Sequence, residues 1–380
     1  MRIAVNTRLL LAGRLDGIGW FSCESLRRIV CTHTEHEFFF FFDRKADPQF
    51  IFASNVHPVV LHPQARHPLL WRAFFDWSIT KALKRYKIDI FLSPDGWLSL
   101  RTNVPTIDVI HDLNFEHAND YLKPSHQRYM TRFFPRFARK ATRLATVSEY
   151  SKKDIVEIYG IEPSKIDVVY NGSNSHYHPC NEAEKIKIKE QYTEGNPYFV
   201  FIGTLSRRKN LENILLAFEL FKQTHKDSSL RLVVAGSKYN LTEGMIAALA
   251  GMEYKNHVLF IGHVDAETLA LLLGSAEALV YTSLFEGFGI PIVESFYAET
   301  PVITSNVTSM PEVAGDAALI VDPYSVEEIA DAMNQIITDA DIRNDLIAKG
   351  RVRRSLFSWD RTAELLWACI QKVAETLPNR

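Results

Sequence analysis

The chain has 380 residues, of which 47% are hydrophobic and 23% are charged, and its formal net charge is −2. That length suits two cores better than one, and the composition is that of an ordinary globular protein. Its four cysteines are scattered without a C-x-x-C pair, which argues for a reducing compartment and against structural zinc. The apolar run at residues 38–42, like the other apolar runs of the chain, is too short to span a bilayer. These features predict a cytoplasmic protein that is soluble or bound at a membrane surface.

The charge is divided unevenly along the chain. Residues 1–175 hold 24 Lys and Arg against 18 Asp and Glu, a net of +6, which leaves 19 against 27, a net of −8, for the remainder. A basic first half favours an anionic partner such as lipid headgroups or a phosphorylated acceptor. No nucleic acid is expected among the partners.

The first half alternates short apolar runs with helical segments. Residues 2–6 form the first predicted strand, and Gly17 and Gly19 open a helix that runs towards Val30. A glycine turn between a strand and a helix suits an anion or a sugar, although a flexible connection explains it equally well. Further strands are expected at residues 37–43, 88–93, 104–110 and 143–147. This alternation predicts a parallel sheet covered by helices on both faces.

Two predicted helices of this half are both basic and aromatic. Residues 67–87 carry Trp71, Phe74, Phe75 and Trp77, and the cations of this segment are accompanied by a single acid, Asp76. Residues 125–143 contain no acid, and Pro135 is expected to interrupt or kink that helix. The aromatic stripe suits a core-facing side, whereas the uncompensated cations favour docking on an anionic lipid surface. The arginines recur every three or four residues, at Arg128, Arg132, Arg136, Arg139 and Arg143.

Polar residues follow the last strands of the first half. His111 comes at the end of a strand, where ligand-facing side chains collect in open α/β sheets, although a lone histidine is more often structural. Ser148 or Ser151 is expected to cap a helix. A strand at residues 166–172 precedes a polar segment, so we expect the domain boundary near residues 172–180. His176 and His178 lie there without carboxylate or cysteine partners, and a linker is preferred to a metal site.

The second half repeats the α/β pattern. A strand at residues 198–202 is followed by a glycine turn and by the cations Arg207, Arg208 and Lys209 before a helix at residues 211–221. Three cations at such a turn fit a diphosphate, which Arg binds bidentately and Lys binds as a point charge. Further strands are expected at residues 230–236, 258–262 and 279–283, and a last helix at residues 358–377.

The most informative stretch is residues 286–294, in which Glu286 and Glu294 are separated by seven residues. An apolar strand precedes it, a glycine-aromatic-glycine turn lies within it, and Pro291 lies in the first turn of a helix predicted at residues 290–298. Such a turn directs backbone N–H groups and the positive end of a helix dipole to one point, which suits a phosphate. A strand-to-helix junction of ordinary structural purpose remains the alternative.

In its context, this stretch resembles the E-x7-E signature of the retaining family 4 glycosyltransferases of the GT-B fold. The resemblance extends to Thr300–Ile303, to Ser309–Gly315, to an I-H-D element at His111, to a V-S-E-x-S turn and to a G-x-L-x-x-R-K-N element. It implies two Rossmann-like domains with parallel sheets facing across a cleft. The expected domains are residues 1–175 on the acceptor side, residues 176–358 for the nucleotide sugar, and a helix at 359–380 that crosses back to the first domain.

The resemblance also implies roles for individual residues. His111 and Glu286 would be catalytic, and Glu294 would contact the nucleotide ribose. Arg208 and Lys209 would hold the donor phosphates. The remaining expected donor-binding residues are Gly17, Gly19, Gly262, His263, Val264, Gly287, Phe288, Gly289 and Ile290.

The sequence thus predicts a retaining hexosyltransferase that uses a nucleotide sugar and a glycan or lipid-linked acceptor. The resemblance to enzymes of surface-polysaccharide and lipopolysaccharide assembly favours mannose from GDP-mannose, with a UDP-hexose as the alternative donor. A nucleotide-sugar epimerase and a non-catalytic nucleotide-sugar-binding protein are the rival functions. No D-x-D triplet is assigned as a cation site, so neither a metal nor another cofactor is expected.

Overall fold

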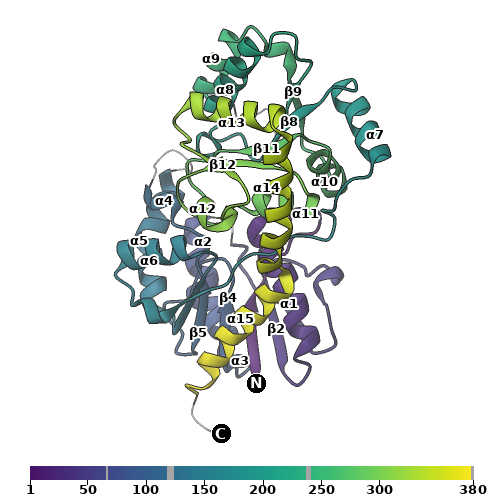
Figure 1. The fold of residues 1–380 in the computed structure, drawn as a ribbon. Helices are drawn as coiled ribbons and strands as arrows, with labels where there is room; N and C mark the ends of the chain where they lie inside the picture. Colours follow the sequence, from purple (N-terminus) through teal and green to yellow (C-terminus); the bar gives the residue numbers. More distant parts are fainter. Residues whose placement is uncertain (66, 118–123, 237–240, 378–380) are drawn as a thin grey trace. The chain divides into compact units, whose positions relative to one another are not determined.

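The computed structural model describes residues 1–65, 67–117, 124–236 and 241–377. The chain forms two compact units (Figure 1). Unit 1 comprises Met1–Gly172 and Ser358–Arg380, and unit 2 comprises Ser173–Phe357. The sequence placed these boundaries after residues 175 and 358.

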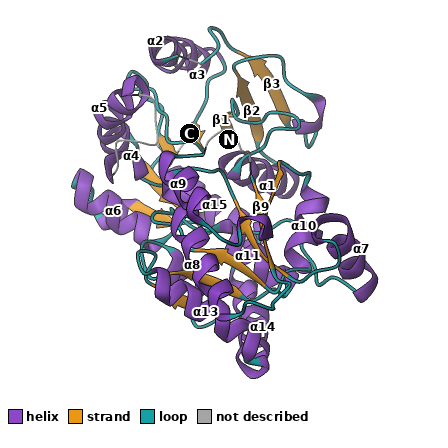
Figure 2. Cartoon of the chain, turned by 90° about the horizontal axis from the view of Figure 1, so that it is seen from above, coloured by secondary structure: helices purple, strands orange, loops and turns teal. Residues whose placement is uncertain are grey.

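Unit 1 is built on a parallel sheet of seven strands in the order β3-β2-β1-β4-β5-β6-β7. Its central strands are buried along their whole length because helices cover both faces (Figure 2). β3 was missed in the sequence, because Pro58 weakens a strand pattern; its place at the sheet edge is where proline is tolerated. The strands are β1 (Arg2–Asn6), β2 (Glu37–Phe42), β3 (Val56–Val60), β4 (Ile90–Ser93), β5 (Thr106–Val109), β6 (Arg143–Thr146) and β7 (Ile166–Val168).

The helices of unit 1 differ from expectation in two places. The segment expected as one helix at residues 67–87 is divided by a π-helical stretch, Ala73–Ile79. The helix α5 continues past Pro135 to Lys140, so Pro135 does not end it. The helices are α1 (Gly17–Thr32), α2 (Pro68–Arg72), α3 (Thr80–Arg85), α4 (Asn114–His117), α5 (Pro124–Lys140), α6 (Glu149–Tyr159) and α15 (Trp359–Ala374).

The arginines of α5 are not all uncompensated, as the sequence had suggested. Arg143, just beyond the helix, is ion-paired with Asp167 on β7, and its Nη2 donates to Oδ1 at 2.8 Å. Arg139 donates to the backbone carbonyl of Tyr159 at 3.2 Å. The expectation is therefore wrong for Arg143, whose partner lies far away in sequence.

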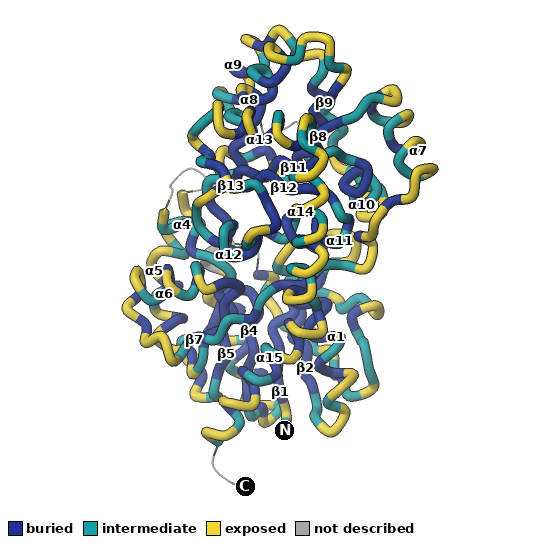
Figure 3. Tube along the Cα trace, in the orientation of Figure 1, coloured by how far each residue is buried: buried dark blue, intermediate teal, exposed yellow. Residues whose placement is uncertain are grey.

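Unit 2 contains a parallel sheet of six strands in the order β10-β9-β8-β11-β12-β13. In Figure 3 the buried parts of the trace follow the strands of both units. The strands are β8 (Tyr198–Ile202), β9 (Arg231–Ala235), β10 (Val258–Gly262), β11 (Ala278–Tyr281), β12 (Val302–Ser305) and β13 (Leu319–Val321). The helices are α7 (Glu182–Thr193), α8 (Leu211–Thr224), α9 (Glu243–Gly251), α10 (Ala266–Gly274), α11 (Ile290–Ala298), α12 (Met310–Ala314), α13 (Val326–Thr338) and α14 (Ala340–Arg353).

The strand order of unit 2 fixes where its functional loops meet. The first strand, β8, lies between β9 and β11, so successive crossovers leave it in opposite directions. The carboxyl ends of two such neighbouring strands form the crevice in which open α/β sheets bind ligands. The loops after β8 and β11, at residues 203–210 and 282–289, therefore come together at this point.

The C-terminal helix α15 belongs to unit 1, where it packs along α1 and across β4, β5 and β6. Ser358 caps it, and Thr362 donates its hydroxyl to the carbonyl of Tyr170 at 2.6 Å. Lys372 pairs with Asp167 at 2.7 Å. The helix is thus tied to the end of the β7 segment although nearly two hundred residues separate them. No helix in the described part of the chain is long and apolar enough to cross a membrane.

Gly172 permits this attachment. A Cβ at that position would lie 2.3 Å from the backbone nitrogen of Trp359, so Gly172→Ala must displace the start of α15. We expect a loss of about 1–3 kcal/mol in the free energy of unfolding, the usual cost of overpacking. Urea denaturation measures it. Gly251→Ala is the matched control, because its Cβ meets nothing within 4 Å. Equal stability of the two variants would contradict this description.

Candidate active site

An ion cluster joins the two loops at the carboxyl end of the unit 2 sheet. Glu286 lies in the loop after β11, and its Oε1 accepts a hydrogen bond from Lys209 Nζ at 2.6 Å. Its Oε2 lies 2.7 Å from Arg208 Nη1. The Glu286 and Lys209 side chains are both only 10% exposed. One carboxylate thus lies between two cations, which leaves the cluster with one net positive charge.

The two cations decide the ionisation of Glu286. Burial by itself would raise the pKa of this carboxyl group, but the charges and hydrogen bonds of Lys209 and Arg208 outweigh it and lower the pKa to about 2. Glu286 is therefore ionised at every physiological pH. Removing one partner from such a buried set leaves an uncompensated charge, which is strongly destabilising.

Tyr281, the last residue of β11, belongs to the same cluster and was missed in the sequence. It is 1% exposed, and its hydroxyl accepts a hydrogen bond from Lys209 Nζ at 2.6 Å. The ammonium group also lies 4.6 Å from the centre of the tyrosine ring. Burial, together with the charge of Glu286 and a hydrogen bond to it, raises the Tyr281 pKa. Tyrosine is common in buried strands, so nothing in the sequence distinguished this one.

Backbone contacts hold the two loops together. Arg208 Nη1 donates to the carbonyl of Phe285 at 2.7 Å, and the Leu284 N–H donates to the carbonyl of Arg208 at 2.8 Å. Asn210, buried and with φ of 59°, donates to the carbonyl of Thr282 at 2.9 Å. The cations are therefore positioned by the loop that carries Glu286, as well as by Glu286 itself.

The segment before α12 fixes the other side of the glycine loop. Ser309 Oγ donates to the carbonyls of Glu286 and Phe288, at 2.9 and 3.0 Å. Thr308 Oγ1 accepts from the N–H of Glu286 at 3.2 Å. Ser309, the first residue of the Ser-Met-Pro element, thus has a structural role in holding the glutamate loop. The loop that contains Gly287 and Phe288 is therefore held by hydrogen bonds to the loop after β8 and to the segment before α12.

The helix α11 begins where the sequence predicted, directly after this loop. Gly289 has φ of 100°, a conformation that favours glycine, and a Cβ there would meet Ile292 at 3.1 Å. Ile290 is the first helical residue, and Pro291 follows in the first turn, where its missing N–H has no cost. The positive end of this helix therefore lies beside Glu286.

Glu294 lies on the second turn of α11, and its environment is opposite to that of Glu286. Burial raises the pKa of this carboxyl group to about 7, although a hydrogen bond to Tyr177 and the charge of Lys209 act in the other direction. The two glutamates of one motif thus have pKa values displaced in opposite directions, as in sites that assign different roles to two carboxylates. Tyr177 belongs to the segment expected as a linker, and no sequence pattern predicts its hydrogen bond with Glu294.

The remaining predicted site residues of the first half of the chain, His111, Gly17 and Gly19, belong to unit 1. His111 Nε2 lies 2.8 Å from the carbonyl of Pro94, and because a carbonyl only accepts, Nε2 carries the proton. Burial lowers the His111 pKa, so the ring is neutral and Nδ1 is an acceptor. Gly17 begins α1, and the Gly19 N–H donates to the capping Asp16 side chain at 2.9 Å.

The remaining expected donor residues lie at the end of β10. Gly262 has φ of 75° and is the last strand residue, and His263 is exposed. Nδ1 of the His263 ring lies 2.7 Å from the carbonyl oxygen of the next residue, Val264. Within residues 1–65, 67–117, 124–236 and 241–377, no group of three or more His, Cys, Asp or Glu side chains is placed to hold a metal ion.

Because the pKa values of Glu286 and Glu294 are displaced in opposite directions, the two residues can be distinguished by measuring stability against pH, without an activity assay. Between about pH 4.5 and 7 the folded state keeps a proton on Glu294 that the unfolded chain has released, so this group lowers stability as pH rises. Glu294→Gln removes that loss. We therefore expect the unfolding temperature of the variant, relative to that of the unsubstituted protein, to increase as the pH is raised from 5 to 8. The same series is measured for Glu286→Gln by thermal denaturation.

Glu286→Gln is expected to behave differently, because Glu286 is ionised in folded and unfolded chains alike throughout this range. Its stabilising contribution is complete above about pH 4.5 and is lost only as pH falls towards 2. It should therefore lower the unfolding temperature by a nearly constant amount from pH 5 to 8. A pH-independent difference for Glu294→Gln would contradict the environment described for that residue.

Comparison with known families identifies the architecture. Residues 20–176 match the model described as Glycosyltransferase Family 4, and residues 182–353 match the model described as Glycosyl transferases group 1. The two matches are consecutive and together cover most of both units.

Individual relatives cover most of the chain. It is 28% identical over 363 residues to O-antigen chain mannosyltransferase B of Escherichia coli, which covers 91% of this chain and 93% of the relative. It is 24% identical over 319 residues to O-antigen chain mannosyltransferase RfbU of Salmonella typhimurium, covering 81% and 83%.

Solved structures share the fold at lower sequence identity. Sucrose-phosphate synthase from Thermosynechococcus elongatus has a TM-score of 0.78 at 17% identity, covering 99% of this chain and 100% of that one. WaaG, described as a glycosyltransferase involved in lipopolysaccharide biosynthesis, has a TM-score of 0.72 at 15% identity, covering 97% and 98%. With its two parallel-sheet units and both family models matched, the chain belongs to the family 4 glycosyltransferases of the GT-B fold.

Proposed function

We propose that this protein transfers a mannosyl residue from GDP-mannose to a hydroxyl of a glycan or lipid-linked acceptor, with retention of configuration and without a metal ion. The observation that carries the proposal is the cluster of Glu286, Arg208, Lys209 and Tyr281 at the switch point of the unit 2 sheet. The names of the E. coli and Salmonella relatives support the choice of mannose.

The cluster suits a donor diphosphate. Arg208 offers a planar fork and Lys209 a point charge, and the N-terminal end of α11 adds the positive pole of a helix. Glu286 holds both cations before the ligand arrives, so little reorganisation is needed on binding. Breaking the glycosidic bond places negative charge on the leaving diphosphate, and preorganised cations stabilise charge that develops in the transition state.

The two glutamates have separate roles in this proposal. Glu294, on the second turn of α11, accepts hydrogen bonds from the ribose hydroxyls in its ionised form. Glu286 lies beside the glycine turn, where it orients the cations and reaches the transferred sugar. Because the Glu294 pKa is about 7, donor affinity should weaken as pH falls below neutrality.

The acceptor side is assigned to unit 1. His111 presents a neutral ring whose Nδ1 can accept a hydrogen bond from a sugar hydroxyl. No carboxylate is assigned as nucleophile, so we favour a same-face reaction in which the leaving phosphate takes the acceptor proton. The exposed arginines of α5 and the exposed Trp77 of the π-helical stretch support peripheral binding at an anionic membrane face.

A UDP-hexose is the second candidate donor. One neighbour of similar fold, Anabaena Alr3699/HepE, is described in complex with UDP and glucose; its TM-score is 0.70 at 17% identity. Arg208 and Lys209 would bind the diphosphate of either nucleotide, so they do not separate the two donors.

Turnover of labelled donors tests the function. We expect transfer from GDP-mannose to exceed transfer from UDP-glucose and UDP-galactose, an α-linked product by NMR, and activity that survives EDTA. The acceptor mixture is a lipid extract from the source cells. An inverted linkage, or activity that returns only with Mg²⁺ or Mn²⁺, would overturn the mechanism, and transfer only from a UDP-hexose would overturn the donor.

Tyr281→Phe tests the role of the buried hydroxyl. The variant keeps the ring under Lys209 but removes one hydrogen bond to a charged group, and we expect kcat/KM to fall about tenfold, mainly in kcat. Tyr198→Phe is the matched control, because Tyr198 is equally buried on the adjacent strand and its hydroxyl donates to the Leu272 carbonyl at 2.7 Å. Similar losses of kcat in both variants would reduce Tyr281 to a packing residue.

A further inference from the structure

Three arginines of unit 1 surround one aromatic ring. The guanidinium carbons of Arg72, Arg132 and Arg136 lie 5.6, 5.8 and 5.5 Å from the centre of the Phe133 ring. Arg132 and Arg136 come from α5, and Arg72 ends α2. We call these four residues the arginine cluster. It brings cations from two separate helices to one place, which the spacing along α5 alone did not predict.

The cluster carries little compensating charge. Arg132 and Arg136 are exposed, and within the described residues no carboxylate lies at ion-pair distance from either. Arg72 has one partner, Asp76, at 3.5 Å, but Oδ1 of that carboxylate also accepts the Leu100 N–H. Like charges gathered around one ring repel one another, so an anion on this surface would stabilise the arrangement.

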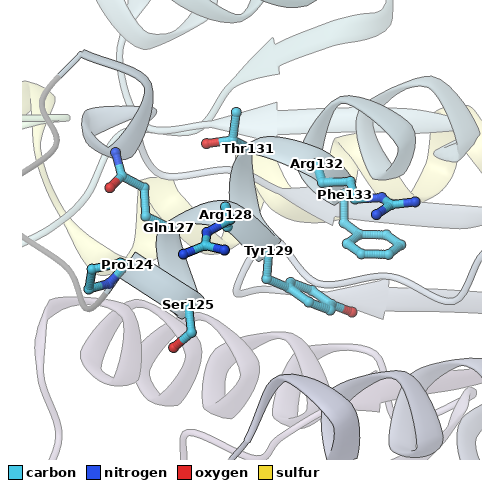
Figure 4. A pocket seen from close by; sticks show the side chains of 8 residues that line it. All are labelled: Pro124, Ser125, Gln127, Arg128, Tyr129, Thr131, Arg132 and Phe133. Carbon is cyan, nitrogen blue, oxygen red and sulfur yellow. The ribbon is translucent and has the colours of Figure 1, made fainter.

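The Phe133 ring at the centre of the cluster is buried and packed against a second aromatic ring. Phe133 is 8% exposed, and its ring stacks on Tyr129 with centres 4.4 Å apart. Figure 4 shows Arg128, Tyr129, Arg132 and Phe133 along one side of α5, where they help to line a hollow of about 700 Å³. A cation held against an aromatic face loses less freedom on binding, and there is room beside it for a ligand.

We propose that the arginine cluster binds the diphosphate group of a lipid-linked acceptor. This inference rests on the proposed function, since it names the acceptor and where its anionic group is held. Each guanidinium can bind a phosphate bidentately, and three of them around one ring match a compact, multiply charged anion. A bilayer of singly charged headgroups would be contacted equally well by cations spread over the surface.

The experiment compares two double variants on three kinds of vesicle. Arg132→Gln/Arg136→Gln removes two cluster charges, and Lys81→Gln/Lys84→Gln removes two exposed charges from α3 in the same unit. Flotation is measured with phosphatidylcholine alone, with a small fraction of a polyprenyl diphosphate, and with phosphatidylglycerol at the same total negative charge. Circular dichroism and thermal unfolding verify that both variants fold.

We expect the unsubstituted protein to prefer the diphosphate vesicles over charge-matched phosphatidylglycerol. The arginine variant should lose affinity for them on the order of tenfold, and the lysine variant less than about twofold. Equal binding to both anionic vesicles, equal loss in both variants, or no vesicle binding would each overturn the proposal. Binding of GDP and UDP to the unsubstituted protein is measured separately, and its absence would count against the proposed function instead.

Discussion

The contact on which the proposed donor site depends is the placement of the Glu286 carboxylate between Arg208 and Lys209. Two cations this close would repel each other in a partly dry site, and one buried carboxylate would be expensive to ionise. Together the three charges offset both costs, and the Tyr281 hydroxyl accepts a further hydrogen bond from Lys209. The loops after β8 and β11 are consequently fixed to each other before any ligand binds, with one positive charge in excess.

The strand order of unit 2 makes this contact available. Because β8 and β11 are neighbours, residues nearly eighty positions apart lie within hydrogen-bond distance. The same order places α11 directly beside the cluster, so in the proposed function its dipole and its second-turn glutamate would bind the same ligand. Burial raises the pKa of Glu294, because fewer cations lie close enough to offset that burial than at Glu286. Two acidic residues of one motif can therefore perform different tasks without any difference in their chemistry.

Much of this site could be predicted from the sequence, because the signals are local. The glycine turn, Pro291 and the apolar strand before them determined the start of α11, and the cations after Gly203 marked the opposite loop. The contacts that could not be predicted are long-range. Tyr281 looks like any strand tyrosine, and Arg143 finds its acid on another strand. The arginine cluster likewise requires Arg72 and α5 to meet, and periodicity within α5 does not show it.

The most direct measurement of the central claim is a double-mutant cycle on GDP binding. Glu286→Gln, Lys209→Met and the double variant are compared with the unsubstituted protein by isothermal titration calorimetry. If Glu286 preorganises Lys209 for the diphosphate, the two substitutions should be coupled by about 1–3 kcal/mol, since each removes the partner on which the other depends. Additive effects would show that the two side chains act independently, and they would contradict the account.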